Sequence, residues 1–289
     1  MNLATLDTVN QSRNIERLIS GQAVLEGAGV KVQRVIGQAL HARLDPFLML
    51  DVFQNEHPDD YIAGFPDHPH RGFETITYML AGRLRHRDSA GNAGLLQSGG
   101  MQWMKAGRGV VHSEMPEQEN GLMEGFQLWL NLPSADKLSD PEYRDVAAEQ
   151  IPSFTLSSGV SVKIILGKSQ GLTGRVTAPV TEALFLDVHL PANSQYQQAL
   201  PRTHNAFVYV YRGAIRIGDH EVPAGNMAIL MNTPDSDGVI LQANHPAQLL
   251  LIAGQPLLAP IVQHGPFVMN TSEQIAQAIA DYRAGRLGA

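Results

Sequence analysis

The sequence predicts an all-β protein made of two tandem antiparallel β-barrels, with an amphipathic helix at the C-terminal end. Short runs rich in Val, Ile, Thr, Phe and Leu recur along most of the chain, and Gly, Pro, Asn and Asp separate them at short intervals. Runs of this kind are typical of the strands of a sandwich or barrel. A repeat within the chain and a helical pattern at its end support the other two parts of the prediction.

The two halves of the chain share a pattern of strand, glycine and strand. The segment FETITYMLAGRLRHRD has Gly82 between two strand-like runs, and AFVYVYRGAIRIGD has Gly213 in the same place. We interpret each segment as a β-hairpin with the glycine in its turn, so the repeat favours a duplicated barrel unit. A more polar stretch with several prolines lies between the halves. We therefore expect domains at 1–135 and 156–289, joined by a linker at 136–155.

The last segment, NTSEQIAQAIADYRAGRLG, carries apolar residues at helical spacing. Ile275, Ile279 and Tyr282 would lie on one face of a helix. Thr271 or Ser272 would cap its N-terminus. This pattern predicts the terminal amphipathic helix.

The composition is that of a globular protein with an acidic surface. Of the 289 residues, 44% are hydrophobic and 17% are charged, unlike the composition of disordered chains. The 21 Lys and Arg residues and the 28 Asp and Glu residues give a net charge of −7. Such a surface repels phosphate backbones, so we expect no direct binding of nucleic acid.

The chain contains no cysteine, which excludes disulfides and thiolate metal sites and leaves His, Asp and Glu as the side-chain metal ligands. No stretch reaches the roughly eighteen apolar residues of a membrane span, and the first residues lack the pattern of a signal peptide. We therefore expect a soluble cytoplasmic protein that does not bind a membrane.

Two doublets of metal-binding residues are the most informative feature of the sequence. His68 and His70 are two positions apart, and His112 and Glu114 repeat that spacing further along the chain. Side chains at i and i+2 of a strand point to the same face, so two strands could aim all four at one divalent metal. Three nitrogens and one oxygen suit Fe(II), Ni(II), Mn(II) or Zn(II) and leave coordination positions open, although the affinity order alone favours Cu(II) and Zn(II). The doublets predict a site for catalysis or sensing.

A second glutamate leaves the choice of the carboxylate ligand open. Glu74 has the strand parity of His68 and His70, so parity alone does not choose between Glu74 and Glu114. The other histidines lack the doublet spacing. We expect the following eight to bind no metal: His41, His57, His86, His189, His204, His220, His245 and His264.

Four separated motifs resemble the pirin family of bicupins. They are HPHRGFET, AGRGVVHSEMP, GFQLWLNLP and QHGPFVMNT, and the similarity extends from about Ile36 to the terminal helix. The resemblance implies that both barrels are cupin domains. It also implies that the first domain binds a metal, usually iron in this family and hence Fe(II), through His68, His70, His112 and Glu114.

The resemblance therefore favours Glu114 over Glu74 as the carboxylate ligand. Glu74 would then support a ligand or pair with Arg71 or Arg108.

The resemblance also implies that the second cupin domain binds no metal. When Gly213 is aligned with Gly82, the positions of His68, His70 and Glu74 are taken by residues that cannot replace them: Ala199, Pro201 and Asn205.

For function, the resemblance implies a metal-dependent dioxygenase whose substrate is a small aromatic molecule, a flavonol such as quercetin. Glu114 would be the catalytic base that takes a proton from the substrate hydroxyl. Four residues are candidates for the apolar wall of the pocket: Phe65, Phe73, Met79 and Phe126. We expect Trp103 and Trp129 to belong to the core.

Two alternatives stay open. Family members are also described as regulators, so the protein could respond to iron or redox state and bind a transcription factor or a metabolic enzyme without catalysing a reaction. The metal could instead only tie two strands together, although structural sites are normally closed tetrahedra.

Overall fold

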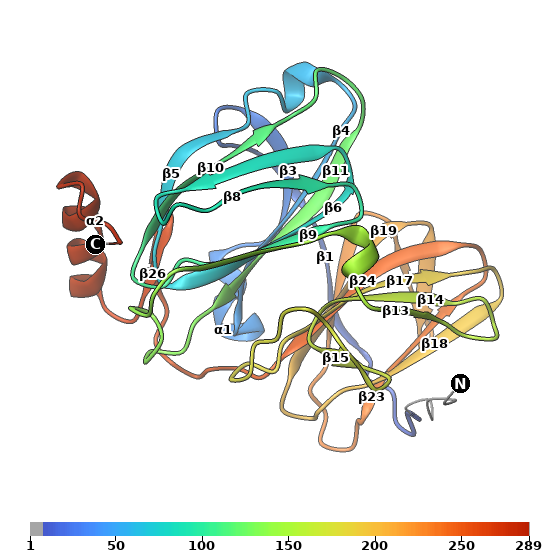
Figure 1. Cartoon of the computed structure of the whole chain (residues 1–289). Helices are drawn as coiled ribbons and strands as arrows, with labels where there is room; N and C mark the ends of the chain where they lie inside the picture. Colours follow the sequence, from blue (N-terminus) through green and yellow to red (C-terminus); the bar gives the residue numbers. More distant parts are fainter. Residues whose placement is uncertain (1–7, 289) are drawn as a thin grey trace. The chain divides into compact units, whose positions relative to one another are not determined.

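The computed structural model describes residues 8–288, and most of the regular structure is β (Figure 1). Contacts divide the chain into two compact units. The N-terminal unit comprises Gln22–Glu149 and Leu257–Ala289, and the C-terminal unit comprises Met1–Gly21 and Gln150–Pro256. Within residues 8–288, every helix is too short or too polar to span a bilayer.

The N-terminal unit contains two antiparallel sheets. Seven strands form one sheet in the order β12-β9-β6-β11-β4-β3-β2, and four form the other in the order β5-β10-β7-β8. The strands are β2 (Gln22–Glu26), β3 (Val30–Ile36), β4 (Phe47–Asn55), β5 (Phe65–His70), β6 (Phe73–Ala81), β7 (Arg83–Asp88), β8 (Ala93–Gln97), β9 (Met101–Lys105), β10 (Val110–Pro116), β11 (Met123–Asn131) and β12 (Glu142–Val146).

The C-terminal unit repeats this arrangement. Its seven-stranded sheet has the order β1-β22-β19-β24-β17-β14-β13, and its four-stranded sheet has the order β18-β23-β20-β21. The strands are β1 (Ile15–Ser20), β13 (Ser153–Thr155), β14 (Ser161–Leu166), β17 (Leu184–Leu190), β18 (Ser194–Ala199), β19 (Asn205–Arg212), β20 (Ala214–Ile217), β21 (His220–Pro223), β22 (Asn226–Leu230), β23 (Gly238–Ala243) and β24 (Ala247–Gly254).

The remaining elements are two short strand pairs and five helical segments among the described residues. Two short strand pairs are β15 (Lys168–Ser169) with β16 (Leu172–Thr173), and β25 (Val262–His264) with β26 (Phe267–Met269). The helical segments are η1 (Gln38–Leu40), α1 (His41–Leu44), η2 (Pro58–Asp60), η3 (Ala148–Gln150) and α2 (Ser272–Arg283). The helix expected at the end of the chain is α2, where Thr271 and Gln274 form a capping box and Ile275 and Ala278 are buried.

The predicted repeat is present, but its two hairpins are not. β6 and β7 lie in different sheets, and so do β19 and β20. Gly82 and Gly213 stand where the chain passes from one sheet to the other, with φ of +94° and +69°. A Cβ on Gly213 would come within 2.4 Å of the Pro246 carbonyl oxygen. Glycine is required at this crossing because it accepts a positive φ and a close backbone contact.

The compact units do not coincide with the domain boundaries expected at 1–135, 136–155 and 156–289. β1 pairs with β22 of the C-terminal unit, and the terminal helix α2 packs on β26 in the N-terminal unit. Part of the expected linker is β12, which pairs with β9. Strand pairing between distant segments overrides the local composition that suggested the boundaries.

The interiors of the two units differ in how far apolar side chains fill them. In the C-terminal unit, the inward residues of nearly every strand join one large cluster that includes Val188, Val208, Leu241 and Leu251, all fully buried. The apolar clusters described in the N-terminal unit are smaller, and one of them includes Phe53.

Candidate metal centre

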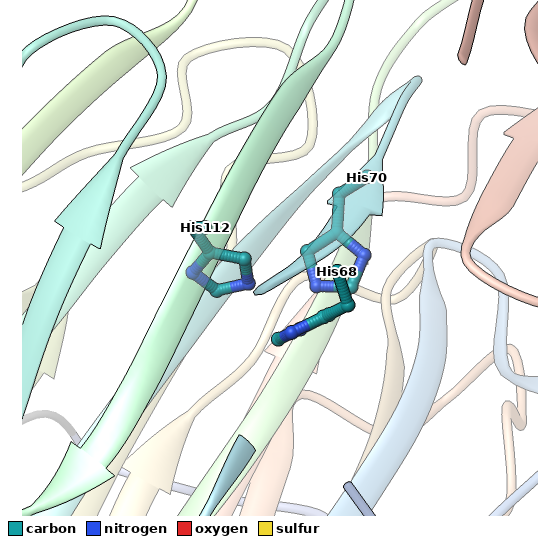
Figure 2. Close-up of side chains that lie close together, drawn as sticks. All are labelled: His68, His70 and His112. Carbon is teal, nitrogen blue, oxygen red and sulfur yellow. The ribbon is translucent and has the colours of Figure 1, made fainter. Parts of the chain in front are cut away.

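The two doublets, His68 with His70 and His112 with Glu114, lie on adjacent strands of the four-stranded sheet in the N-terminal unit. β10 pairs with β5, and the register sets His112 opposite His68 and Val110 opposite His70. The potential ligand atoms of the three histidines all lie within 4.8 Å of one another. Figure 2 shows these three side chains coming together from the two strands. The alternation of side chains along a strand, which led to the prediction, accounts for this arrangement.

Two buried ring nitrogens in this cluster have no hydrogen-bond partner. They are Nδ1 of His70 and Nε2 of His112. Burial, and then the neighbouring histidines, hold the pKa of both rings well below its usual range, so the rings are neutral and each carries one free lone pair. Buried nitrogens are rarely left unpaired because the lost hydration is costly. Coordination of a metal ion would satisfy both, so the residues fit the group that the motifs imply.

The other ring nitrogen of each histidine is held by the protein. Nδ1 of His68 donates to the Pro66 carbonyl over 2.8 Å, and the His70 ring hydrogen-bonds to the Pro266 carbonyl. Nδ1 of His112 lies 3.4 Å from Nδ1 of His86. Such contacts orient the rings of metal-binding histidines and select the tautomer that can bind.

His70 depends on a segment from the far end of the chain. Pro266 lies between β25 and β26, and this pair is joined to the end of β5 by backbone hydrogen bonds. The Arg71 amide donates to the Pro266 carbonyl over 3.3 Å, and the Val268 amide donates to the Arg71 carbonyl over 3.0 Å. The C-terminal residues therefore complete the site.

Glu114 lines the same cavity as His68 and His70, but its carboxylate does not belong to the three-histidine cluster. The side chain is buried, and it accepts hydrogen bonds from Thr77 Oγ1 at 3.3 Å and Gln127 Nε2 at 2.9 Å. The Trp129 indole donates to Gln127 Oε1 over 3.2 Å, which turns the Gln127 amide group toward Glu114. The carboxylate is thus held at the cavity wall by neutral donors.

Glu74 lies elsewhere, and the parity argument that related it to the doublets is wrong. β5 and β6 belong to different sheets, and Gly72 with φ of +89° breaks the alternation between them. Glu74 pairs in register with Lys105, and burial raises the pKa of its carboxyl group to about 8, with Lys105 opposing the shift. Among the described residues that line the cavity, Glu74 is absent.

The expected pairing of Glu74 with an arginine is also wrong. Arg71 pairs with Asp281 of α2 at 2.9 Å, and Arg108 pairs with Asp140. Arg71, the residue that follows the first doublet, therefore ties the end of β5 to the terminal helix.

A cavity of about 550 Å³ opens beside the histidines, between the two sheets of the N-terminal unit. Ligand sites commonly occupy about 300–1,000 Å³ with mostly apolar walls. The apolar lining residues are Val32, Met49, Phe53, Phe65, Leu84 and Trp129. Three charged residues also line the cavity: the Arg34 guanidinium forms ion pairs with Asp51 at 2.6 Å and with Glu26 at 2.7 Å.

Only one of the four apolar wall residues expected from the sequence, Phe65, lines this cavity. Phe73 packs behind it, with its ring 5.0 Å from His70 and stacked on Trp129 at 4.2 Å. Met79 belongs to the apolar cluster, and Phe126 stacks on Tyr78. Trp129, expected in the core, belongs to a buried apolar cluster with Phe73 and also lines the cavity. Strand alternation decides which apolar residues near the motifs face the cavity.

The C-terminal unit has other residues at the matching positions. On β18 and β23, which take the places of β5 and β10 in the sheet order, Tyr196 pairs with Leu241, and the buried residues of β18 are Tyr196 and Gln198. β18 therefore offers no histidine. Ala199 ends β18 and Pro201 lies beyond it, because residues 200–204 separate β18 from β19 whereas residues 71–72 separate β5 from β6. The alignment that used Ala199 and Pro201 therefore does not follow the strands.

Sequence reasoning missed the residues that support the ligands and the cavity. His86 was expected to be unrelated to the metal, yet it contacts His112. Its i,i+2 spacing from Asp88 was the available signal. Thr77 and Gln127 carry no signal in the sequence beyond their place on strands.

Comparisons with known proteins agree with the motifs. The family model Pirin matches residues 29–130, and the model Pirin C-terminal cupin domain matches residues 185–288. A Pseudomonas aeruginosa protein named "putative quercetin 2,3-dioxygenase" is 46% identical over 280 residues, or 95% of this chain and 98% of that protein. Human pirin is 38% identical, and the match covers 97% of this chain and 96% of pirin.

A solved structure agrees as well. The crystal structure of a quercetin 2,3-dioxygenase from Acinetobacter baumannii matches with a TM-score of 0.89 and 32% identity, over 96% of this chain and 99% of that chain. The chain therefore belongs to the pirin family, as its four motifs predicted.

Proposed function

We propose that this protein is an iron-dependent dioxygenase of the quercetin 2,3-dioxygenase type, with a flavonol as substrate. The observation that carries the proposal is the pair of buried, unpartnered ring nitrogens of His70 and His112, next to a largely apolar cavity that His68 and His70 line. The names of the Pseudomonas relative and of the Acinetobacter structure support the choice of reaction.

The ligands in this proposal are His68, His70, His112 and Glu114. When bound, the metal supplies a Lewis acid with open coordination positions for substrate and dioxygen. Iron is proposed because the family usually binds it, while the donor set also accepts Ni(II), Mn(II), Zn(II) and Cu(II).

Glu114 is proposed to take the proton of the substrate hydroxyl. A general base must lie within hydrogen-bond reach of the proton it removes, and Glu114 lines the cavity that the substrate would enter. Thr77 and Gln127 hold the carboxylate by hydrogen bonds and bring no competing charge. They would keep the carboxylate oriented before the substrate arrives.

The cavity walls are proposed to select a flat aromatic ligand. Phe53, Phe65 and Trp129 offer aromatic surface that excludes water from the reacting groups. Arg34 lies at the same cavity, held by Asp51, and can donate a hydrogen bond to a phenolic oxygen.

The test is turnover of quercetin by iron-loaded protein. Mixing without oxygen should shift the absorption spectrum of quercetin through binding alone, and admission of air should then release carbon monoxide. Glu114→Gln should lower kcat by about 100-fold or more, the range expected for loss of a general base. Glu74→Gln is the matched control because Glu74 is equally buried but lies away from the cavity.

Iron-loaded protein that leaves quercetin unchanged in air would overturn the catalytic proposal. Equal loss of kcat in the two glutamate variants would overturn the role of Glu114. If quercetin is not consumed, the regulatory alternative predicts a protein partner whose capture depends on the bound metal or its oxidation state.

A further inference from the structure

We propose that His86 and Asp88 are positioning residues of the metal centre. Their hydrogen bonds keep the proton of His112 on Nδ1 and leave Nε2 free to bind a metal. The inference rests on the proposed metal site but does not depend on which reaction, if any, the metal supports.

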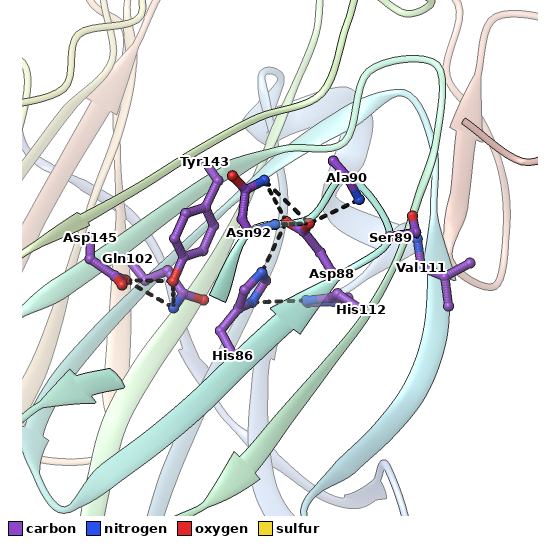
Figure 3. A network of polar contacts seen from close by, with 10 residues as sticks. All are labelled: His86, Asp88, Ser89, Ala90, Asn92, Gln102, Val111, His112, Tyr143 and Asp145. Carbon is purple, nitrogen blue, oxygen red and sulfur yellow. Dashed lines mark hydrogen bonds and ion pairs between the residues drawn. The ribbon is translucent and has the colours of Figure 1, made fainter. Parts of the chain in front are cut away.

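The three side chains form a continuous series inside the N-terminal unit (Figure 3). Oδ2 of Asp88 lies 3.2 Å from Nε2 of His86, and Nδ1 of His86 lies 3.4 Å from Nδ1 of His112. His86 is completely buried, and its ring stacks on Tyr143 with centroids 4.4 Å apart. Because β7 and β10 pair directly, the series is built on two adjacent strands of one sheet.

The direction of these hydrogen bonds follows from Asp88. Oδ1 of Asp88 accepts from the backbone amides of Ala90 at 3.0 Å and Asn92 at 2.9 Å, and the Asn92 side-chain amide donates to both carboxylate oxygens. The side chain of Asp88 thus acts as an acceptor toward its neighbours. Its contact with Nε2 of His86 therefore requires a proton on that nitrogen.

That proton determines the tautomer of the ligand. In the proposed arrangement His86 carries a single proton, on Nε2, and its Nδ1 atom offers a lone pair. Nδ1 of His112, 3.4 Å away, is then the donor and carries the proton. Nε2 of His112 is left unprotonated, and it is the buried nitrogen that has no hydrogen-bond partner. In the opposite tautomer, an N–H group would occupy the position where the metal binds.

His112 differs from the other two histidines in the kind of partner that fixes it. Backbone carbonyls of Pro66 and Pro266 accept from His68 and His70, and a carbonyl can only accept. The partner of His112 is the His86 side chain, whose Nδ1 atom could donate or accept. A second group is therefore needed to fix which nitrogen of His86 carries the proton. Asp88 is that group, which explains why two residues support one ligand.

The C-terminal unit offers a matched pair that supports no ligand histidine. Nε2 of His189 lies 3.2 Å from Oδ2 of Asp187, which is again two residues away on a strand. Tyr211 donates to Asp187 over 2.6 Å and lies 3.0 Å from His189. His189→Phe is therefore a control for the loss of a His–Asp pair.

The first test measures the tautomers directly in metal-free wild-type protein. Ring ¹⁵N chemical shifts of histidine-labelled protein should show the proton on Nδ1 of His112 and on Nε2 of His86. A proton on Nε2 of His112, or a doubly protonated His86, would overturn the proposal without any variant.

The second test measures Co(II) affinity by competition with a chelator. His86→Phe retains a ring beside Tyr143 but no nitrogen, and it should weaken binding by about 10- to 100-fold, as for other groups that support metal ligands. His86→Asn restores an acceptor near the position of Nδ1 and should recover most of the affinity. His189→Phe should bind as tightly as wild type.

Unchanged affinity in a folded His86→Phe protein would overturn the proposal, and so would equal losses in the His86→Phe and His86→Asn variants. Both tests are independent of quercetin. A protein with the predicted tautomers and no turnover would refute the proposed function alone, whereas turnover with the opposite tautomer would refute this inference alone.

Discussion

The two units arrange their strands in the same order but differ in what they place between the sheets. In the N-terminal unit, β5 and β10 turn His68 and His112 toward each other beside a cavity. In the C-terminal unit, the matching strands turn Tyr196 and Leu241 into a continuous apolar core. The strand order therefore does not determine whether a unit can bind a metal. A few inward positions distinguish the unit with the three-histidine cluster from the unit with the large apolar core.

The N-terminal unit replaces part of the missing apolar packing with long-range polar contacts. The buried Lys137 donates to the carbonyls of Gly72 and Val268, at 2.8 and 2.9 Å, and to Asn131 at 2.8 Å. These contacts join the loop after β11, the turn that follows the first doublet, and β26. Buried polar groups that are fully paired favour one arrangement of the backbone, which suits a site whose ligands must be held in place.

The largest expected effect comes from making the N-terminal unit resemble its counterpart. His112→Leu introduces on β10 a leucine such as Leu241, which is buried on β23 of the C-terminal unit, and removes a proposed ligand with little change in volume. We expect Fe(II) affinity to fall by at least about 100-fold, since two imidazoles remain. Metal content after dialysis and the unfolding midpoint of the metal-free protein should be measured together. His189→Leu should keep the full metal content, and a metal-replete His112→Leu protein would contradict the comparison.

The second effect is a loss of stability in the C-terminal unit. Leu241→Ala removes a fully buried side chain from the core of the C-terminal unit. It should lower the free energy of unfolding by about 2–5 kcal/mol and leave the metal stoichiometry unchanged. Thr77→Ala, at the cavity of the N-terminal unit, should cost only about 1 kcal/mol, the value of one hydrogen bond. Urea unfolding gives both values, and a larger loss for Thr77→Ala would show that the cavity lining is as tightly packed as the core.

The third effect is a pH dependence of the free energy of unfolding that belongs to the N-terminal unit. The pKa of Glu74 is about 8 in the folded chain against its ordinary 4.5. Between these values the folded state binds more protons than the unfolded state, so the unfolding free energy falls as the pH rises. The stabilisation is complete below about pH 4.5 and is lost as the pH passes 8.

Glu74→Gln should remove this dependence. Urea midpoints of wild type and variant should therefore diverge between pH 5 and pH 8, with wild type losing more stability over that interval. If the urea midpoints of wild type and variant change in parallel with pH, Glu74 is ionised in the folded protein. The effect of Lys105 on the pKa of Glu74 would then outweigh the effect of burial.

The histidine cluster could be predicted from the sequence because it depends on local geometry. Each doublet needs only the alternation of one strand, and the pairing of β5 with β10 brings the two doublets together. The same rule failed for Glu74, because a positive φ at Gly72 and a change of sheet interrupt the alternation. It failed for the hairpins at Gly82 and Gly213 for the same reason.

Features that depend on distant pairing could not be predicted. β1 joins the sheet of the C-terminal unit through β22, and Pro266 supports His70. The sequence near either segment carries no mark of its partner. His86 was missed because its role depends on a contact with His112 across two strands, although its spacing from Asp88 was visible.

The support of His70 by Pro266 has a consequence for how the protein matures in the cell. A nascent chain that has emerged only as far as the end of the C-terminal unit at Pro256 already contains all three histidines, but it lacks the carbonyl that orients the second. The proposed metal pocket consequently cannot be completed until the residues beyond Pro256 have been translated. Termination between Pro256 and Pro266 would yield a chain that contains all three histidines but lacks the carbonyl that orients His70.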